Sequence, residues 1–247
     1  MSETQAPFTE SQYRELLRLA RSHWTFTDYR NCLSQERAIL WRHDIDMSPM
    51  RALRLARIER EAGIASTYFI LPHSPFYNLL EPEAAEAVLA IRDLGHTLGL
   101  HFDPAFYRKR VRSQEELIPY MEAERAFLET VFKGPIDVFC LHCPSEYPGI
   151  CLFDDQVAGM INAMGRSVLD RYEYVSDSNG YWRFQQLPEM LENGSPDRLH
   201  VCAHPVWWTP EPMAPRSRIQ RCIDGRAQAT GRWYDDLLAR LNRKNIR

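Results

Sequence analysis

Residues 38–62 predict a buried strand that ends in charged residues and is followed at once by a helix. Ala38–Trp41 form an apolar run typical of a buried strand, and charged residues continue it as Arg42-His43-Asp44-Ile45-Asp46. A buried strand tolerates such charges only when they are paired or bind a metal. Side chains at i and i+2 of a strand share a face, so Asp44 and Asp46 are expected to project together. Ser48-Pro49 then predicts the start of a helix, and α/β folds carry their chemistry at such strand-to-helix junctions.

Strand and helix patterns alternate along the rest of the chain, which predicts an α/β fold built on a parallel sheet or barrel. Helical spacing and capping residues predict helices over 9–21, 82–94, 113–134, 154–164 and 232–243, and short apolar runs predict strands over 63–71, 97–101, 136–141 and 199–203. Pro119 lies inside the third of these helices and is expected to kink or restart it. No repeat or linker divides the sequence, so residues 1–247 are expected to form a single domain, with the motifs between about 38 and 210.

The composition excludes several classes of function. Charged residues make up 26% of the chain and hydrophobic residues 45%, with a formal net charge of −3, so neither a nucleic-acid nor an anionic-membrane partner is expected. No apolar run approaches the ~18–20 residues of a membrane span, and the N-terminal residues lack the pattern of a secretory signal. The expected location is therefore the cytoplasm. There the six cysteines would be free thiols, with Cys140 and Cys143 buried rather than part of a zinc site.

Four predicted strands end on side chains that can bind a metal or transfer a proton. These side chains are Asp44 with Asp46, His101, His142 and His204. In a parallel sheet that curves into a barrel, the carboxyl ends of successive strands meet at one mouth. One carboxylate and two imidazoles suit a divalent metal of the zinc type, and a second carboxylate that stays off the metal could act as a general base on water.

The order of these motifs resembles the polysaccharide deacetylase family of the NodB-homology type, which is related to carbohydrate esterase family 4. Arg42 to Asp46 resembles the first motif in the branch that writes it as R-H-D-x-D (WbmS-like), and Gly95 to His101 resembles the second motif. Asp177 to Trp182 resembles a fourth motif, and Ala203-His204-Pro205 resembles the fifth. The resemblance covers roughly residues 40 to 206 and implies a distorted (β/α) barrel.

This resemblance also implies a reaction, the hydrolysis of an N-acetyl group on a sugar, and a role for each residue. Asp44 would be the general base, while Asp46 and His101 would bind a divalent metal, for which zinc is the expected ion. His204 would be the general acid that protonates the departing amine, and Asp177 would orient it.

Two departures from the family pattern concern the third metal ligand. The family's second metal histidine normally follows the first by four residues, where this chain has Ala105. The third motif normally has an arginine two residues before a proline, where this chain has His142 before Pro144. His142 is the simplest replacement ligand, Asp103 is the competing candidate, and His142 could instead only position Asp44.

Arg42, Trp182 and Trp207 are expected to contact the carbohydrate, and the two tryptophans offer flat apolar faces on which a pyranose ring could stack. An enzyme in the cytoplasm would act on a nucleotide-linked or lipid-linked sugar precursor rather than on a mature wall polymer. Two alternatives stay open. The chain could be another metal-dependent amide or ester hydrolase, or a sugar-binding protein that keeps the fold without turnover.

Overall fold

A computed structural model describes residues 8–144 and 153–246. The predicted single domain therefore extends beyond the described residues at both ends, and residues 145–152 of its motif-bearing part also lie outside them. The helices are α1 (Glu10–His23), α2 (Pro49–Glu61), α3 (Pro82–Asp93), α4 (Pro104–Tyr107), α5 (Ile118–Phe132), α6 (Arg166–Leu169), α7 (Leu187–Asn193) and α8 (Pro215–Arg240). The strands are β1 (Thr25–Thr27), β2 (Ala38–Ile45), β3 (Thr67–Ile70), β4 (Thr97–Phe102), β5 (Val138–Leu141), β6 (Gln156–Val157), β7 (Met160–Asn162), β8 (Glu173–Ser176) and β9 (Arg198–Ala203).

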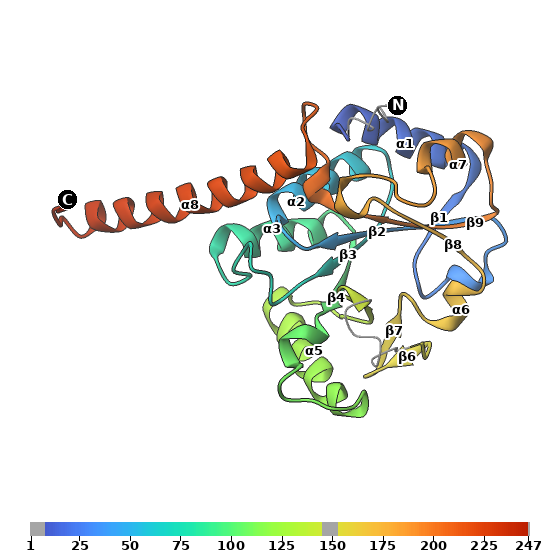
Figure 1. Cartoon of the computed structure of the whole chain (residues 1–247), viewed down its shortest axis with the longest axis horizontal. Helices are drawn as coiled ribbons and strands as arrows, with labels where there is room; N and C mark the ends of the chain where they lie inside the picture. The colour runs from blue at the N-terminus through green and yellow to red at the C-terminus, as the bar shows by residue number, and fades with distance from the viewer. Residues whose placement is uncertain (1–7, 145–152, 247) are drawn as a thin grey trace.

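The strands of the described ranges form one curled sheet in the order β6-β7-β5-β4-β3-β2-β9-β8 (Figure 1). β1 pairs with the first half of β2, and β3 pairs with its second half. Neighbouring strands are parallel except β6 and β7, which form an antiparallel hairpin. The sheet curls into an open half barrel, so the predicted α/β fold of the distorted-barrel type is confirmed.

The two faces of β2 explain how a strand can be buried and charged at once. All eight of its residues are buried, because β3 and β9 flank it and both its faces are covered. Trp41 packs outward with the apolar residues of α1 and α2, whereas Leu40 lies on the opposite face with Phe69. The two-residue period of a strand puts Asp44 on the same face as Leu40. Asp44 is therefore directed into the half barrel.

The helices that flank β2 begin at the predicted caps. The Thr9 hydroxyl accepts a hydrogen bond from the backbone N–H of Gln12 at 3.2 Å, and α1 follows. The Ser48 hydroxyl accepts one from the backbone N–H of Arg51 at 3.2 Å, and Pro49 is the first residue of α2. These caps satisfy backbone donors that have no partner within the helix.

Three predicted helices differ from the structure. The helix expected over 113–134 begins at Ile118, so Pro119 lies in its first turn, where a missing N–H costs nothing, rather than in its interior. The helix expected over 154–164 is instead the β6–β7 hairpin. Its turn residues Ala158 and Gly159 have φ values of 52° and 69°, which a helix does not allow and a tight hairpin turn requires. The closing helix expected over 232–243 is part of the longer α8.

Helix α8 runs out from the body of the protein over most of its length (Figure 1). Its first turns pack against the segment that follows β9, and Arg218 is its only buried residue. Among the residues that the structure describes, no helix combines the length and the apolar character of a membrane span.

Candidate functional site

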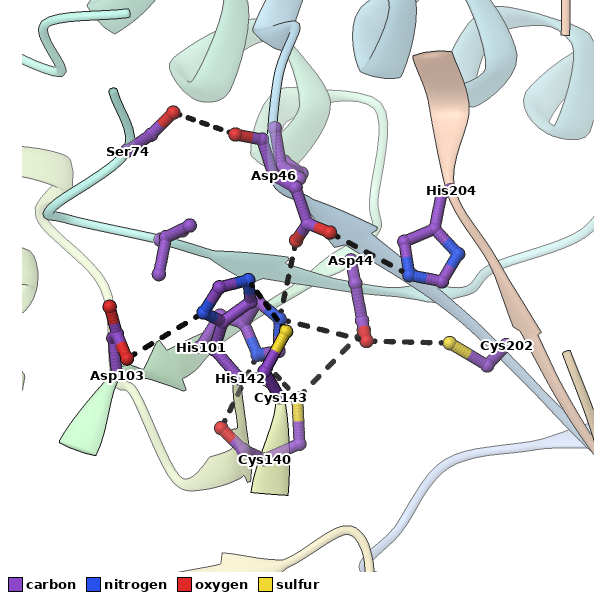
Figure 2. A network of polar contacts seen from close by, with 12 residues as sticks. Asp44, Asp46, Ser74, His101, Asp103, Cys140, His142, Cys143, Cys202 and His204 are labelled. Atoms are coloured by element: carbon purple, nitrogen blue, oxygen red, sulfur yellow. Dashed lines mark hydrogen bonds and ion pairs between the residues drawn. The ribbon is translucent and has the colours of Figure 1, made fainter. Parts of the chain in front are cut away.

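The carboxyl ends of four strands of the sheet bring acidic and imidazole side chains to one place (Figure 2). Asp44 lies in β2 and Asp46 directly after it, His101 lies in β4, His142 follows β5, and His204 follows β9. Because these strands are parallel and neighbours or near neighbours in the sheet, their ends face the same mouth of the half barrel. The structure thus brings together the five residues that the sequence predicted to meet.

Asp46, His101 and His142 form a compact group of possible metal ligands. One ligand atom from each lies within 4.8 Å of the other two. The Nε2 atom of His101 lies 3.3 Å from Oδ1 of Asp46, yet this buried oxygen has no hydrogen-bond partner in the described ranges. One carboxylate and two imidazoles that converge in this way match the donors that zinc and similar divalent ions prefer. These residues therefore fit a divalent cation.

Asp103 lies outside this group. Its Oδ1 is 3.6 Å from Nδ1 of His142, and its side chain also accepts a hydrogen bond from the backbone N–H of Ala105 at the start of α4 (Figure 2). This geometry places Asp103 behind the His142 ring, where an outer carboxylate orients a ligand histidine. Of the two candidates for the third ligand, the arrangement favours His142.

Asp44 is a buried carboxylate next to that group. Its Oδ2 lies 3.1 Å from the Arg42 guanidinium and accepts from the Cys202 thiol at 3.3 Å, and its Oδ1 lies 3.8 Å from the Cys140 thiol. Burial alone would raise the pKa of Asp44, but Arg42, followed by His101 and His204, holds this pKa below its ordinary value. Burial raises the pKa of Cys202 to about 11, so this thiol is protonated at neutral pH and can donate. Asp44 is therefore an ionised carboxylate whose two oxygens are held in place by hydrogen bonds.

His204 forms a pair with Asp177, which follows β8. The Nδ1 atom of His204 donates to Oδ1 of Asp177 at 2.7 Å, and the fully buried Asp177 also accepts from the backbone N–H of His204 and from the indole N–H of Trp208 at 2.9 Å each. The other ring nitrogen lies 3.7 Å from Oδ2 of Asp46. Burial by itself would lower the pKa of His204, but Cys202 and Asp177 raise it well above its ordinary value. Because the Cys202 thiol is neutral at pH 7, the Asp177 carboxylate is the effective cause.

The three residues expected to contact the sugar do not lie on an open surface. Arg42 is buried beneath Asp44, with its guanidinium 5.4 Å from the Phe69 ring centre. Trp182 and Trp207 are only 5% and 6% exposed, because they pack into the core beside α1 and α7. Both rings are thus largely covered, and the Arg42 guanidinium contacts Asp44. Contact of these three residues with a carbohydrate stays a prediction. Cys143, expected to be buried with Cys140, is exposed.

A second buried charged cluster lies on the outer face of β2. Glu59 of α2 is fully buried and accepts hydrogen bonds from the hydroxyls of Tyr13, Tyr68 and Ser66, and it lies 2.5 Å from Nε2 of His43. Burial would raise its pKa, but His43 and the other partners lower it to about 2. His43, the histidine of the R-H-D-x-D motif, therefore links β2 to α2 and lies on the face of β2 away from the mouth of the half barrel.

Residues two positions before the predicted site residues were missed by the sequence reasoning. Cys140 precedes His142, Cys202 precedes His204, and each has its thiol within 3.8 Å of Asp44. A signal for them exists in the sequence, because residues i and i+2 of a strand share a face. Applied to each strand end, this period predicts a layer of side chains just below the mouth.

Comparison with known proteins finds similar folds only among solved structures, since no family model and no curated protein matches the chain. The chain is similar to the peptidoglycan deacetylase PdaC from Bacillus subtilis, at 13% identity and a TM-score of 0.46, over 87% of this chain and 99% of that one. It is also similar to a family 4 carbohydrate esterase from Bacillus anthracis, at 10% identity and a TM-score of 0.43, over 91% and 90% of the two chains.

A third similar structure is that of a pseudoenzyme of carbohydrate esterase family 4 with restored enzymatic activity, at 11% identity and a TM-score of 0.45. The match covers 79% of this chain and 64% of the pseudoenzyme, so the chain spans less than two thirds of its length. At such low identities these matches show a similar backbone fold and say nothing about the side chains of the site. The functional inference therefore depends on the side chains described above.

Proposed function

We propose that this protein is a divergent polysaccharide deacetylase of the R-H-D-x-D branch, a metal-dependent hydrolase that removes an N-acetyl group from a sugar or sugar precursor. One observation carries the proposal. The buried base Asp44 lies between a group of three metal-type ligands and the His204–Asp177 pair, with His101 Nε2 3.7 Å from its Oδ2. Amide hydrolysis needs a base for water and an acid for the departing nitrogen, and this mouth supplies one on each side.

The metal would be held by Asp46, His101 and His142, with zinc as the expected ion. Such an ion supplies Lewis acidity, which polarises a carbonyl and makes a nearby water more acidic. Asp103 would fix the orientation of the His142 ring from outside.

The protein's own residues would perform both proton transfers. Asp44 takes a proton from the water whose oxygen forms the new bond to the acetyl carbon. His204 gives its Nε2 proton to the sugar nitrogen as the carbon–nitrogen bond breaks, so that acetate and a free amine leave. Arg42 keeps Asp44 ionised before the reaction, and Asp177 keeps His204 protonated. The hydrogen-bond partners of both groups are buried, so neither side chain needs to reorganise.

The proposal is tested by measuring metal content and acetate release from a panel of N-acetyl sugars. We expect one divalent ion per chain, and we expect Asp44→Asn to lower acetate release by roughly 10²–10⁴-fold while the ion stays bound. Asp197→Asn is the matched control, because Asp197 is 76% exposed in a surface ion pair before β9. Its activity should equal that of the wild type.

Other outcomes would point to the alternatives. Bound metal with hydrolysis of other amides or esters, but no acetate from any N-acetyl sugar, would indicate a different hydrolase. Tight sugar binding with neither metal nor acetate would indicate a binding protein. Acetate release that survives Asp44→Asn unchanged would refute the assignment of Asp44 as the base.

A further inference from the structure

A cavity of about 400 Å³ adjoins the proposed active site on the side of α8. Met47 and Ser48 line it directly after Asp46 in the chain, and Val206 lines it two residues after His204. Tyr77, another lining residue, donates its hydroxyl proton to the carbonyl of Ile45 at 2.8 Å. The cavity therefore connects to the proposed active site through the chain neighbours of Asp46 and His204, although neither of these two residues lines it.

Arginines dominate the charge of this cavity. Arg51, Arg218, Arg221, Arg226 and Arg232 line it, against two acidic residues, Glu81 and Glu83, so the lining has a formal excess of three positive charges. A groove with low-dielectric walls and one sign of charge concentrates ions of the opposite sign.

The pairing of these arginines leaves positive charge open to a ligand. Arg226 forms an ion pair with Glu81, and Arg51 forms one with Glu10, which lies outside the lining. Arg221 and Arg232 are exposed, and no ion pair is recorded for either within the described ranges. Burial lowers the pKa of Arg51, the hydrogen bond and charge of Glu10 raise it, and the positive charge of Arg221 lowers it. Glu10 therefore balances Arg51, and the exposed Arg221 and Arg232 are the guanidinium groups open to an anion.

The remaining walls suit an organic group attached to such an anion. Met47, Met50 and Phe76 supply apolar surface, and the first turn of α2, the positive end of its dipole, also lines the cavity. Planar guanidinium forks match the oxygen geometry of phosphate groups in particular. A cavity of this size also falls in the range of small-molecule sites.

From this juxtaposition we infer that the substrate is an N-acetyl sugar linked to a phosphate or diphosphate, whose phosphate groups bind the arginine-lined cavity while the acetyl group enters the mouth. The inference rests on the proposed deacetylase function and names its substrate class. A nucleotide-linked sugar and a lipid-diphosphate-linked sugar share this chemistry. Either would place an anion next to Arg221 and Arg232, with its base or lipid along the apolar wall.

The test compares acetate release from four probes, which are N-acetylglucosamine, its 1-phosphate, its uridine diphosphate conjugate and its conjugate with a short polyprenyl diphosphate. We expect kcat/KM for at least one phosphate-bearing probe to exceed that for the neutral sugar by roughly tenfold or more, which is the effect of one or two charge-assisted hydrogen bonds. The two diphosphate conjugates tell the nucleotide and lipid sources apart.

Matched variants connect this preference to the cavity. The double variant Arg221→Gln/Arg232→Gln should raise KM for the preferred probe by about tenfold. The kcat for this probe and the kcat/KM for the neutral sugar should stay the same. Arg240→Gln, on the same helix but outside the cavity, should change nothing. Equal use of neutral and phosphate-bearing sugars by the wild type, or an unchanged KM in the double variant, would overturn the inference and leave the deacetylase proposal intact.

Direct binding separates the two proposals if no probe releases acetate. Calorimetric titration with uridine diphosphate and with inorganic pyrophosphate measures the cavity without any reaction. Binding that weakens in the double variant but not in Arg240→Gln would support the phosphate site even though the deacetylase proposal had failed. No binding of either compound to the wild type, together with no acetate release, would refute both.

Discussion

The pair formed by Asp177 and His204 allows a sharp test of the proposed acid. Asp177→Asn keeps the size of the side chain but replaces one carboxylate oxygen with an NH₂ group. Three N–H donors face the two oxygens, namely Nδ1 and the backbone N–H of His204 and the indole N–H of Trp208, at 2.7 to 2.9 Å. Either a donor then meets the new NH₂ group, which costs about 1–3 kcal/mol for the unsatisfied buried group, or the His204 ring changes to the tautomer whose Nδ1 accepts a hydrogen bond.

The same substitution should reduce catalysis more than stability. Without the carboxylate the ring loses the charge that keeps it protonated and fixes its tautomer, so we expect kcat for acetate release to fall by roughly 10²–10⁴-fold. Asp177 raises the pKa of His204 well above its usual value, and the acid must carry a proton to act. The alkaline limb of the pH–rate profile should therefore move to lower pH in the variant, and the difference from the wild type should grow from about pH 6 to about pH 8.

The assay is a pH series of acetate release for wild type, Asp177→Asn and the control Asp197→Asn, with thermal unfolding measured on the same samples. A loss in Asp177→Asn that is the same at every pH would refute the claim that this carboxylate holds the proton on His204. A loss that tracks unfolding alone would reduce Asp177 to a structural residue. The alkaline shift without unfolding is the result that the geometry requires.

Three further predictions concern stability and the metal ligands. Glu59 has a folded-state pKa of about 2 against an ordinary value of 4.5, so the stability that it contributes is fully present above about pH 4.5 and is lost as the pH falls toward 2. Urea unfolding should therefore show Glu59→Gln to be less stable than the wild type by about 3 kcal/mol at pH 7, with a smaller difference at about pH 3.5. His142→Ala should weaken zinc binding, measured by calorimetry, more than the roughly 10–100-fold expected for the outer residue in Asp103→Ala, and the reverse order would make Asp103 the ligand. Gly99→Ala would place a methyl group 2.6 Å from the Phe69 ring and should lower the unfolding free energy by about 1–3 kcal/mol, whereas unchanged thermal unfolding would show that β4 can shift.

Much of the fold could be predicted from the sequence because interactions between residues close together in the chain determine it. The caps at Thr9 and Ser48 and the apolar run of β2 act through neighbouring residues, and the structure has them where the sequence predicted. The hairpin at residues 156–162 was predicted as a helix, because its apolar spacing fits both periods. Its turn at Ala158 and Gly159 shows only in the backbone angles.

For the site, the sequence by itself determined which groups end the strands, and the parallel order of a single sheet made their meeting expected. Only the tertiary structure decided what surrounds them. It set Arg42 beneath Asp44, buried Trp182 and Trp207 in the core, and brought the arginines of α8 next to the start of α2. A strand's two-residue period fixes which side a residue faces, but burial and pairing depend on elements more than a hundred residues away, which no local pattern records.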